Sequence, residues 1–360
     1  LGWNRNRNLD DSIKERHVLE NLQPSRHLEK LSIWNYDGTQ FPSWLSDNSS
    51  CKVVSLRLKN CKYCLYLPPL GLLPFLKKLT IEGLDGIVSI NADFYGSRSC
   101  SFTSLESLKF VDMKEWECKG VTGAFPRLQR LSIEQCHKLK GLLPGQLCHL
   151  NYLRISGCEQ LVPSALSAQD IHELFLGDCG KLQIDHSSTF KILTINGHNV
   201  EAALLEQMGR NYSCSNKNTP MSCCYDFLVT LNIEGGGDSL TTIPLVIFPI
   251  LQLSVLYCPN MKIPMSGCHG FLVRLHINGG CDSLTTIPLD IFPILRDLYI
   301  WRCPNLQRIS QVHAHNHLQH LGIRECSQLE SLPEGMHVLL PSLDDLSIYL
   351  CPKVKKFPEG

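Results

Sequence analysis

The sequence predicts an α/β repeat protein, a solenoid of stacked short strands, from three observations. The pattern LxxLxI, in which x is any residue, recurs along the whole 360-residue chain. Its mean spacing is about 24 residues, within the range of about 20–29 residues that leucine-rich repeats show. Eight units continue with a cysteine after the apolar triplet, in the extended form LxxLxIxxCxxLxxLP. The fourteen units begin near Leu28, Val53, Leu76, Leu105, Leu128, Leu150, Ile171, Phe190, Leu228, Leu251, Leu272, Leu295, Leu318 and Leu343.

Each unit is expected to supply one short strand whose Leu and Ile side chains point inward, then a turn and a return path. One unit cannot bury its apolar side alone, so the units must stack as a parallel sheet. We therefore predict a curved horseshoe with the sheet on its concave face and irregular segments or short helices on its convex side. The pairs Leu67-Pro68, Leu143-Pro144 and Leu332-Pro333 should keep the return path extended and unpaired.

The whole chain, residues 1–360, is thus expected to form one repeat domain with two unusual segments. Residues 196–227 read as a longer insertion on the convex side, with a short helix from Asn199 to Gly209. Residues 220–263 and 264–309 are tandem duplicated units, because 220–251 and 264–295 match at 24 of 32 positions. The opening LGWN could be the tail of a repeat strand, which suggests a fragment of a longer protein.

Three of the eight differences between the two copies alternate along one predicted strand and so share its outward face. They are Thr230/Arg274, Asn232/His276 and Glu234/Asn278. Two interpretations are open. Any solvent-exposed face can drift, or this face is a contact surface that varies between copies, as a recognition protein requires.

The repeated cysteines favour reduced thiols in a cytosolic protein. Neighbouring strands are close enough for disulfides, but several runs contain odd numbers and the intervening units carry His198, Gly236 or Gly280 instead. The chain is also long enough to build a core without disulfides. The eight repeated cysteines are Cys61, Cys136, Cys158, Cys179, Cys258, Cys303, Cys326 and Cys351.

The sequence offers a protein-binding face and no catalytic, cofactor or metal site. Lys and Arg total 34, as do Asp and Glu, so no net charge favours nucleic acid. No apolar stretch reaches the roughly 20 residues that a membrane span needs. Aromatic and basic side chains concentrate binding energy in interfaces. At outward strand positions these are Trp34, Arg57, Lys59, Arg130, Tyr152, Arg154, Phe175, Arg274, His276, Tyr299, Trp301, Arg324 and Tyr349.

Other clusters have structural explanations. Cys61 and Cys64 form a CxxC pair, yet no second pair follows at zinc spacing. The histidines of QVHAHNHLQH, which are His313, His315, His317 and His320, fit a loop before a strand better than a metal tract. Cys214, Cys223 and Cys224 lie in the polar insertion, where oxidation is more plausible than metal binding.

Several phrases closely resemble the C-terminal repeats of plant coiled-coil nucleotide-binding leucine-rich-repeat disease-resistance proteins. They are VLENLQPSRHLEKLSI, GTQFPSWL, LPPLGLLPFLKKLTI, SFTSLESLKFVDMKEWE, CPNLQRISQ and LPEGMHVLLPSLDDLSI. The resemblance covers nearly the whole chain. It implies an intracellular receptor whose repeats sense a pathogen effector or an altered host protein, and hold a nucleotide-binding switch in its ADP-bound resting state.

The nucleotide site itself is absent from this sequence. No GxxxxGK[ST] loop occurs, and the nearest approach, Gly177 with Gly180-Lys181, has the wrong spacing. The resemblance therefore places ADP or ATP in an upstream domain, and we assign no cofactor here.

Two other functions stay open at this point. An extracellular repeat receptor would use Asn48 and Asn211 as glycan acceptors, but its usual LxGxIP repeat is missing. The substrate-binding arm of a ubiquitin-ligase adaptor with an F-box also uses cysteine-bearing repeats, but the FPSWL and LPPLG phrases argue against it.

Overall fold

The computed structural model describes the chain as two compact units, residues 1–188 and 189–360, which we treat separately. Residues with described positions are 1–2, 12–46, 52–96, 101–117, 125–140, 147, 149–161, 171–179, 191–197, 228–235, 242–243 and 250–354. The predicted helix between Asn199 and Gly209 lies outside these residues, as do Cys214, Cys223 and Cys224. No helix among the described residues is long and apolar enough to cross a bilayer.

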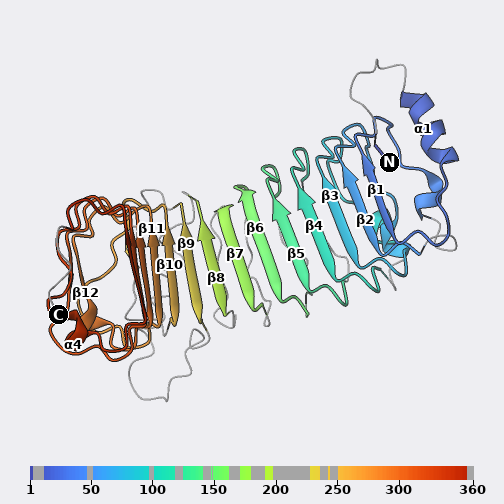
Figure 1. Cartoon of the computed structure of the whole chain (residues 1–360). Coiled ribbons are helices and arrows are strands. Elements are labelled where there is room, and N and C mark those ends of the chain that lie inside the picture. The colour runs from blue at the N-terminus through green and yellow to red at the C-terminus, as the bar shows by residue number, and fades with distance from the viewer. Residues whose placement is uncertain are drawn as a thin grey trace, which may run out of the picture. The chain divides into compact units, whose positions relative to one another are not determined.

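The described residues of the first unit form seven parallel strands that pair in the order of the sequence (Figure 1). They are β1 (Lys30–Trp34), β2 (Ser55–Lys59), β3 (Lys78–Glu82), β4 (Ser107–Val111), β5 (Arg130–Glu134), β6 (Tyr152–Cys158) and β7 (Glu173–Cys179). The described parts of its return segments include the short helices η2 (Ser43–Ser46), η3 (Leu70–Leu72) and α2 (Ala92–Tyr95). Gly2 also forms a parallel bridge with Trp34 beside β1.

A longer helix that the sequence analysis missed, α1 (Ser12–Asn21), precedes β1. Its Leu19 is fully buried, and the carbonyl of Leu19 accepts a hydrogen bond from Trp44 Nε1 at 3.0 Å. Trp44 belongs to the phrase FPSWL and is itself buried. The indole therefore ties the helix to the return path of the first repeat.

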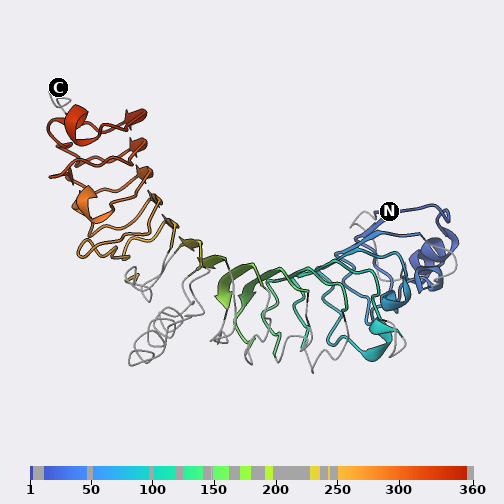
Figure 2. The ribbon, with the colours of Figure 1, turned by 90° about the horizontal axis from the view of Figure 1, so that it is seen from below.

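In the second unit, the main sheet of the described residues also has seven parallel strands in sequence order. They are β8 (Ile192–Asn196), β9 (Thr230–Glu234), β10 (Gln252–Leu256), β11 (Arg274–Asn278), β13 (Asp297–Trp301), β15 (His320–Arg324) and β16 (Asp345–Tyr349). On the return side lie η4 (Leu289–Ile291) and α4 (Met336–Leu339). Within each unit, Figure 2 shows the strands along one side and the return segments along the other. The predicted leucine-rich-repeat solenoid is confirmed.

Part of the return path of the second unit does pair, but none of the paired residues belongs to a predicted Leu-Pro pair. There β12 (Thr286–Pro288) and β14 (Arg308–Ser310) form a two-stranded parallel sheet, and Arg308 also bridges Ser331. Pro288 is the last residue of β12, where its missing N–H costs no ladder bond.

Neighbouring strands of the main sheets pair without a register shift, so equivalent residues stack. Leu31 pairs with Leu56, and Leu275 with Leu298. The second and fourth residues of the strands are buried in every strand except β16, and Leu31, Leu131 and Leu298 are at most 5% exposed. The expected inward face is confirmed.

Each main strand is associated with one residue in the left-handed region, which follows the strand directly except in β6 and β7, where it is the sixth residue of the strand. Its N–H donates to the carbonyl of the fifth residue of the next strand in most units, for example Asn35 to Lys59 at 2.9 Å and Tyr257 to Asn278 at 2.7 Å. Five of these positions are glycine. The complete set is Asn35, Asn60, Gly83, Asp112, Gln135, Gly157, Asp178, Gly197, Gly235, Tyr257, Gly279, Arg302, Glu325 and Leu350.

The repeated cysteine comes directly after this turn, and its thiol is buried. The Cys158 thiol donates to the carbonyls of Ser156 at 3.4 Å and Ile133 at 3.7 Å, the second of which belongs to the preceding repeat. The Cys61 and Cys326 thiols make the same two bonds. The described cysteines are all free thiols, as expected for the reduced form.

One more cysteine belongs to this series than the sequence analysis counted. The eleventh unit has an extra residue, so Gly280 follows the turn and Cys281, 1% exposed, takes the buried place; its N–H donates to the Cys258 carbonyl at 2.8 Å. Gly280 has φ +156°, and a Cβ there would lie 2.6 Å from the Cys258 nitrogen. Only glycine fits this position.

The tenth unit begins one residue earlier than predicted. Ile250 is buried and Leu251, the expected start, is 38% exposed. Leu251 matches Leu295 in the duplicated copy, but one residue fewer separates it from its strand. The match between the two copies therefore does not identify the buried first residue of this unit, which is Ile250.

The buried and half-exposed sides of β13 give a direct test of register. Leu298→Ala should lower the free energy of unfolding by about 2–5 kcal/mol, because it leaves a cavity among fully buried side chains. Tyr299→Ala should cost less, since the Tyr299 side chain is only half-buried. Thermal melts that rank the two variants in the opposite order would show that the register is wrong.

The left-handed turns predict an unusual stabilising change at Leu350, whose φ is 53° and whose side chain is 58% exposed. Leu350→Gly should raise the free energy of unfolding by about 0.5–1 kcal/mol, because relief of steric strain exceeds the added chain entropy. Leu350→Ala is the control, since it keeps the Cβ that causes the strain. Urea unfolding in which the glycine variant is no more stable than the alanine variant would contradict this.

The buried thiols predict a sharp difference in reactivity. Burial raises the pKa of Cys61, Cys179 and Cys281 to about 12, so these groups stay protonated at pH 8. Iodoacetamide should therefore modify exposed Cys268 in the folded chain and reach the other three only after unfolding. Mass spectrometry of peptides alkylated before and after urea treatment measures this, and equal labelling of Cys268 and Cys281 in the folded chain would refute it.

Candidate protein-binding face

The outward side chains of the main strands form the candidate site. We define the strand face as the first, third and fifth residues of each main strand, because alternate strand residues point to opposite sides of a sheet. All thirteen residues predicted for protein binding lie on the strand face, and none of them is buried. Their binding role stays a prediction.

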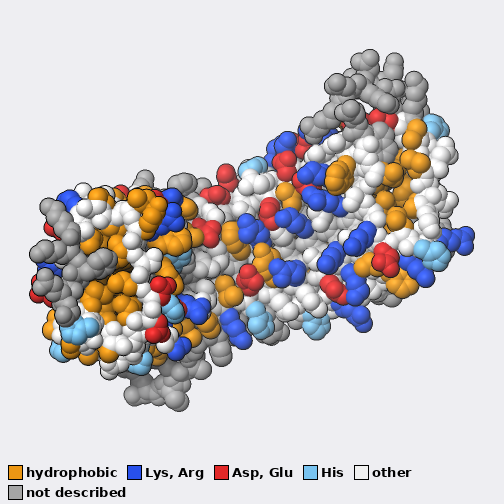
Figure 3. All heavy atoms as spheres, in the orientation of Figure 1, with side chains coloured by type: hydrophobic (Ala, Val, Ile, Leu, Met, Phe, Trp, Pro, Cys, Tyr) orange, Lys and Arg blue, Asp and Glu red, His pale blue; other side chains and the backbone are white. Residues whose placement is uncertain are grey.

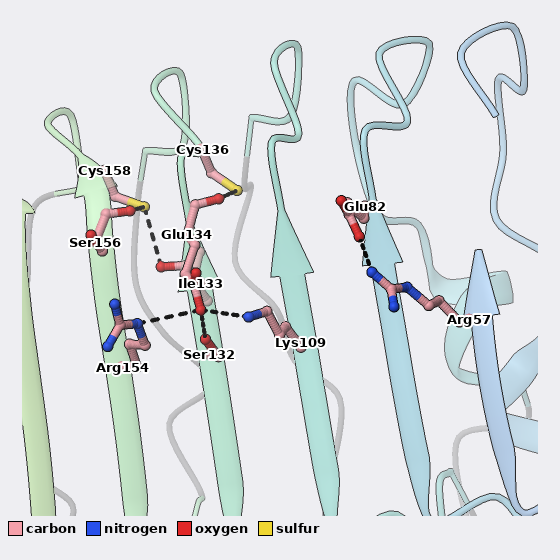
Figure 4. Close-up of polar contacts among 10 residues, drawn as sticks. All are labelled: Arg57, Glu82, Lys109, Ser132, Ile133, Glu134, Cys136, Arg154, Ser156 and Cys158. Carbon is pink, nitrogen blue, oxygen red and sulfur yellow. Dashed lines mark hydrogen bonds and ion pairs between the residues drawn. The ribbon is translucent and has the colours of Figure 1, made fainter. Parts of the chain in front are cut away.

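In the first unit, one carboxylate joins two basic side chains of the preceding strand. Glu82 on β3 pairs with Arg57 at 2.6 Å (Nη2 to Oε2) and with Lys59 at 2.7 Å (Nζ to Oε1), both on β2. Figure 4 shows the Arg57–Glu82 bond. Partial burial alone would raise the pKa of Glu82, but the two cations outweigh it and lower the pKa.

A second carboxylate, Glu134 on β5, is shared by three strands (Figure 4). Its Oε1 accepts hydrogen bonds from Lys109 Nζ at 2.8 Å and Ser132 Oγ at 2.6 Å, and Arg154 Nε lies 3.4 Å away on the other side. These donors outweigh the effect of partial burial, so the pKa of Glu134 lies below its usual value. The carboxylate thus remains charged and fixed.

Two arginines of the same region lie over aromatic rings of the next strand. The Arg130 guanidinium carbon is 4.1 Å from the centre of the Tyr152 ring, and that of Arg154 is 3.5 Å from the Phe175 ring. Such cation–π contacts are worth about 0.5–1 kcal/mol at exposed sites. They hold long, flexible cations in defined positions.

An open pocket of about 420 Å³ lies on the strand face of β4, β5 and β6. Figure 3 shows Lys and Arg side chains recurring across the strands of the first unit. The residues that line the pocket are Ser107, Leu108, Lys109, Arg130, Leu131, Ser132, Glu134, Tyr152 and Arg154.

The strand face of the second unit has aromatic rings in contact with one another on two neighbouring strands. The His276 ring on β11 meets the rings of Tyr299 and Trp301 on β13 edge-on, with centroid distances of 6.3 and 5.0 Å. Burial lowers the pKa of His276, so the neutral imidazole is favoured. These three side chains form a continuous aromatic patch.

Charged residues flank this patch. Asp297 on β13 pairs with Arg274 Nε at 2.7 Å and with His320 Nδ1 at 2.6 Å, from the strands on either side. Further along, the Arg324 guanidinium lies 5.2 Å from the centre of the Tyr349 ring. The predicted residues of this unit are therefore in contact with their neighbours.

The binding residues predicted from the sequence were aromatic or basic, so they did not include the acidic members of these networks, Glu82, Glu134 and Asp297. Lys109 is basic but was not predicted either. The signal that could have found them is opposite charge at outward positions of consecutive repeats, since such residues lie side by side once the repeats stack in register.

The histidine cluster does not converge on one point. His313 is 85% exposed in its side chain and pairs with Asp290 at 3.1 Å. His315 is buried, its Nε2 lies 2.7 Å from the Phe292 carbonyl, and its Nδ1 accepts from the Leu318 N–H at 3.1 Å. His315 thus connects repeats as a core residue. Among the described residues no His, Cys, Asp or Glu group could hold a metal ion.

The CxxC pair is likewise part of the core. Cys61 and Cys64 are both fully buried, and the Cys64 thiol donates to the Gly38 carbonyl at 3.2 Å. Each thiol already has a carbonyl acceptor in the preceding repeat. The geometry supports a structural role for both.

Comparison with known proteins relates the chain to plant disease-resistance proteins. Residues 1–84 match the family model described as R13L1/DRL21 leucine-rich repeats. The putative disease resistance RPP13-like protein 1 of Arabidopsis thaliana is 43% identical over 165 residues, which is 42% of this chain and 16% of that protein. The putative disease resistance protein RGA4 of Solanum bulbocastanum is 33% identical over 145 residues, 38% of this chain and 14% of that protein.

The chain thus spans only a small part of the length of these relatives. Among solved structures, the leucine-rich-repeat domain of the type III effector XopL aligns with 99% of this chain and 80% of its own. The TM-score is 0.26 at 14% sequence identity.

Proposed function

We propose that this chain, a leucine-rich-repeat region of the kind found in plant disease-resistance proteins, recognises another protein through its strand face. The recognised protein would be a pathogen effector or a host protein that an effector has altered. In the same receptor, the repeats would hold an upstream nucleotide-binding switch at rest, inside the cell. Binding and not catalysis would be the activity of this chain.

The observation that carries the proposal is a strand face with aromatic and arginine side chains held in place. Tyr, Trp and Arg are enriched among the residues that dominate interface energies. Here Arg130, Arg154 and Arg324 lie over rings, so less rotamer freedom remains to be lost when a partner binds.

The duplicated units support the same function. Leu231 pairs in register with Leu253 and then Leu275 on the buried side, so the core residue is kept between copies. The outward residues at the first, third and fifth positions all differ between β9 and β11. The outward residues thus differ between the copies while the buried residues are kept. This is expected if the strand face is selected for different contacts.

Resistance in plants that carry the full-length gene product tests recognition. The double variant Arg324→Ala with Tyr349→Ala should lose resistance to pathogen isolates that the wild type resists, because it removes an exposed pair from the strand face. The control is Arg296→Ala with Phe271→Ala, an exposed arginine and an aromatic residue away from that face. Equal accumulation of the proteins is checked by immunoblot.

Two results of this experiment would count against the proposal. Full resistance in the strand-face variant would show that this part of the face is not used. Equal loss in both double variants would show an effect on the fold and not on recognition. Cell death that a variant causes without any pathogen would identify residues that hold the switch at rest.

A further inference from the structure

Although the whole chain has no net charge, the strand face of the first unit is basic. The strand-face positions of β1–β7 carry seven basic and three acidic side chains, whereas those of the second unit carry two and three. The basic residues are Lys30, Arg57, Lys59, Lys78, Lys109, Arg130 and Arg154, and the acidic ones are Glu82, Glu134 and Glu173. The strand face of the first unit therefore has a formal charge of +4.

This face already binds carboxylates of its own. Glu82 lies between two cations at 2.6 and 2.7 Å, and Glu134 takes one ammonium, one hydroxyl and one guanidinium from three strands. A carboxylate on one strand thus lies within reach of basic side chains on a neighbouring strand.

Part of the positive charge has no acidic partner. Lys30, Lys78 and Arg130 form no ion pair with any residue that the structure describes. Arg130 is exposed at the pocket of about 420 Å³, held 4.1 Å from the Tyr152 ring. The Ser107 hydroxyl also belongs to that pocket, whereas Lys109 and Ser132 already bond to Glu134. A fixed guanidinium and a hydroxyl are donors that a ligand carboxylate can use.

We propose that the strand face of the first unit binds an acidic segment of the recognised protein, with one carboxylate of that segment in the pocket beside Arg130. The inference rests on the proposed function and specifies the chemistry of the partner. Glu134 lowers the charge of the pocket, so it sets the affinity for the incoming carboxylate.

A peptide fits this face better than a nucleic acid does. A nucleic acid carries a negative charge on every phosphate at a short, regular spacing. Glu82, Glu134 and Glu173 would each repel such a backbone. An acidic peptide can place its carboxylates opposite Lys78 and Arg130 and uncharged residues opposite the glutamates.

Fluorescence anisotropy with the 360-residue chain tests the proposal. The probe is a labelled ten-residue peptide of alternating Glu and Gly, titrated at about 50 mM salt, where screening is weak. Arg130→Glu should weaken binding about tenfold or more, and Arg130→Gln should weaken it less. Arg127→Glu is the matched control, because Arg127 is exposed in the same repeat but precedes the strand; it should change the affinity less than about twofold. Glu134→Gln should tighten binding, because it frees Lys109 and Arg154.

Several outcomes would overturn the inference. If Arg130→Glu and Arg127→Glu weakened peptide binding equally, the overall charge of the chain would attract the peptide and there would be no specific site at Arg130. Tighter binding of single-stranded DNA of equal charge would mean a nucleic-acid surface. Weaker binding after Glu134→Gln would mean that Glu134 organises the pocket and does not compete with the ligand. If the peptide does not bind while the Arg324/Tyr349 variant still loses resistance, the proposal of an acidic partner is wrong. The proposed recognition function is then still supported.

Discussion

The rest of the architecture depends on one backbone hydrogen bond, which the N–H of the left-handed turn residue donates to the next repeat in most units. The backbone adopts a left-handed conformation there, and the turn N–H reaches the fifth residue of the next strand, as from Asn60 to Glu82 at 2.7 Å. This bond fixes the stacking of one repeat on the next. Because the register never shifts, apolar residues stay on one side and the strand face on the other.

The sequence was sufficient to predict the stacked strands, since alternation of Leu and Ile determines which side chains are buried. It was not sufficient where one residue is inserted or deleted. Cys281 occupies its buried place only because Gly280 can follow the turn, and Ile250 replaces Leu251 because a loop is one residue shorter. The backbone hydrogen bonds determine which residue is buried after such an insertion or deletion, and the local pattern of apolar residues does not reveal it.

The residues of the strand face could be named in advance, but their interactions could not. Positions such as Arg57 and Tyr299 follow from the period of a strand, and both are placed as expected. Whether an outward cation is paired depends on the neighbouring repeat, about 25 residues away in sequence. Glu134 lies between Lys109 and Arg154 for this reason, and the composition of one repeat alone does not reveal it. The small sheet of β12 and β14 was also missed, because each strand has only three residues.

The register in which the strands pair does not depend on the length of the segments between them, and this has an evolutionary consequence. The duplicated copies differ by one residue in the segment that leads into the next strand, yet β10 and β13 both pair in register with β11. Recombination between repeats can therefore tolerate a breakpoint in this segment that is shifted by one residue. A gene of this kind can gain or lose whole repeats, and with them sections of its contact surface, while each remaining repeat still meets a compatible neighbour.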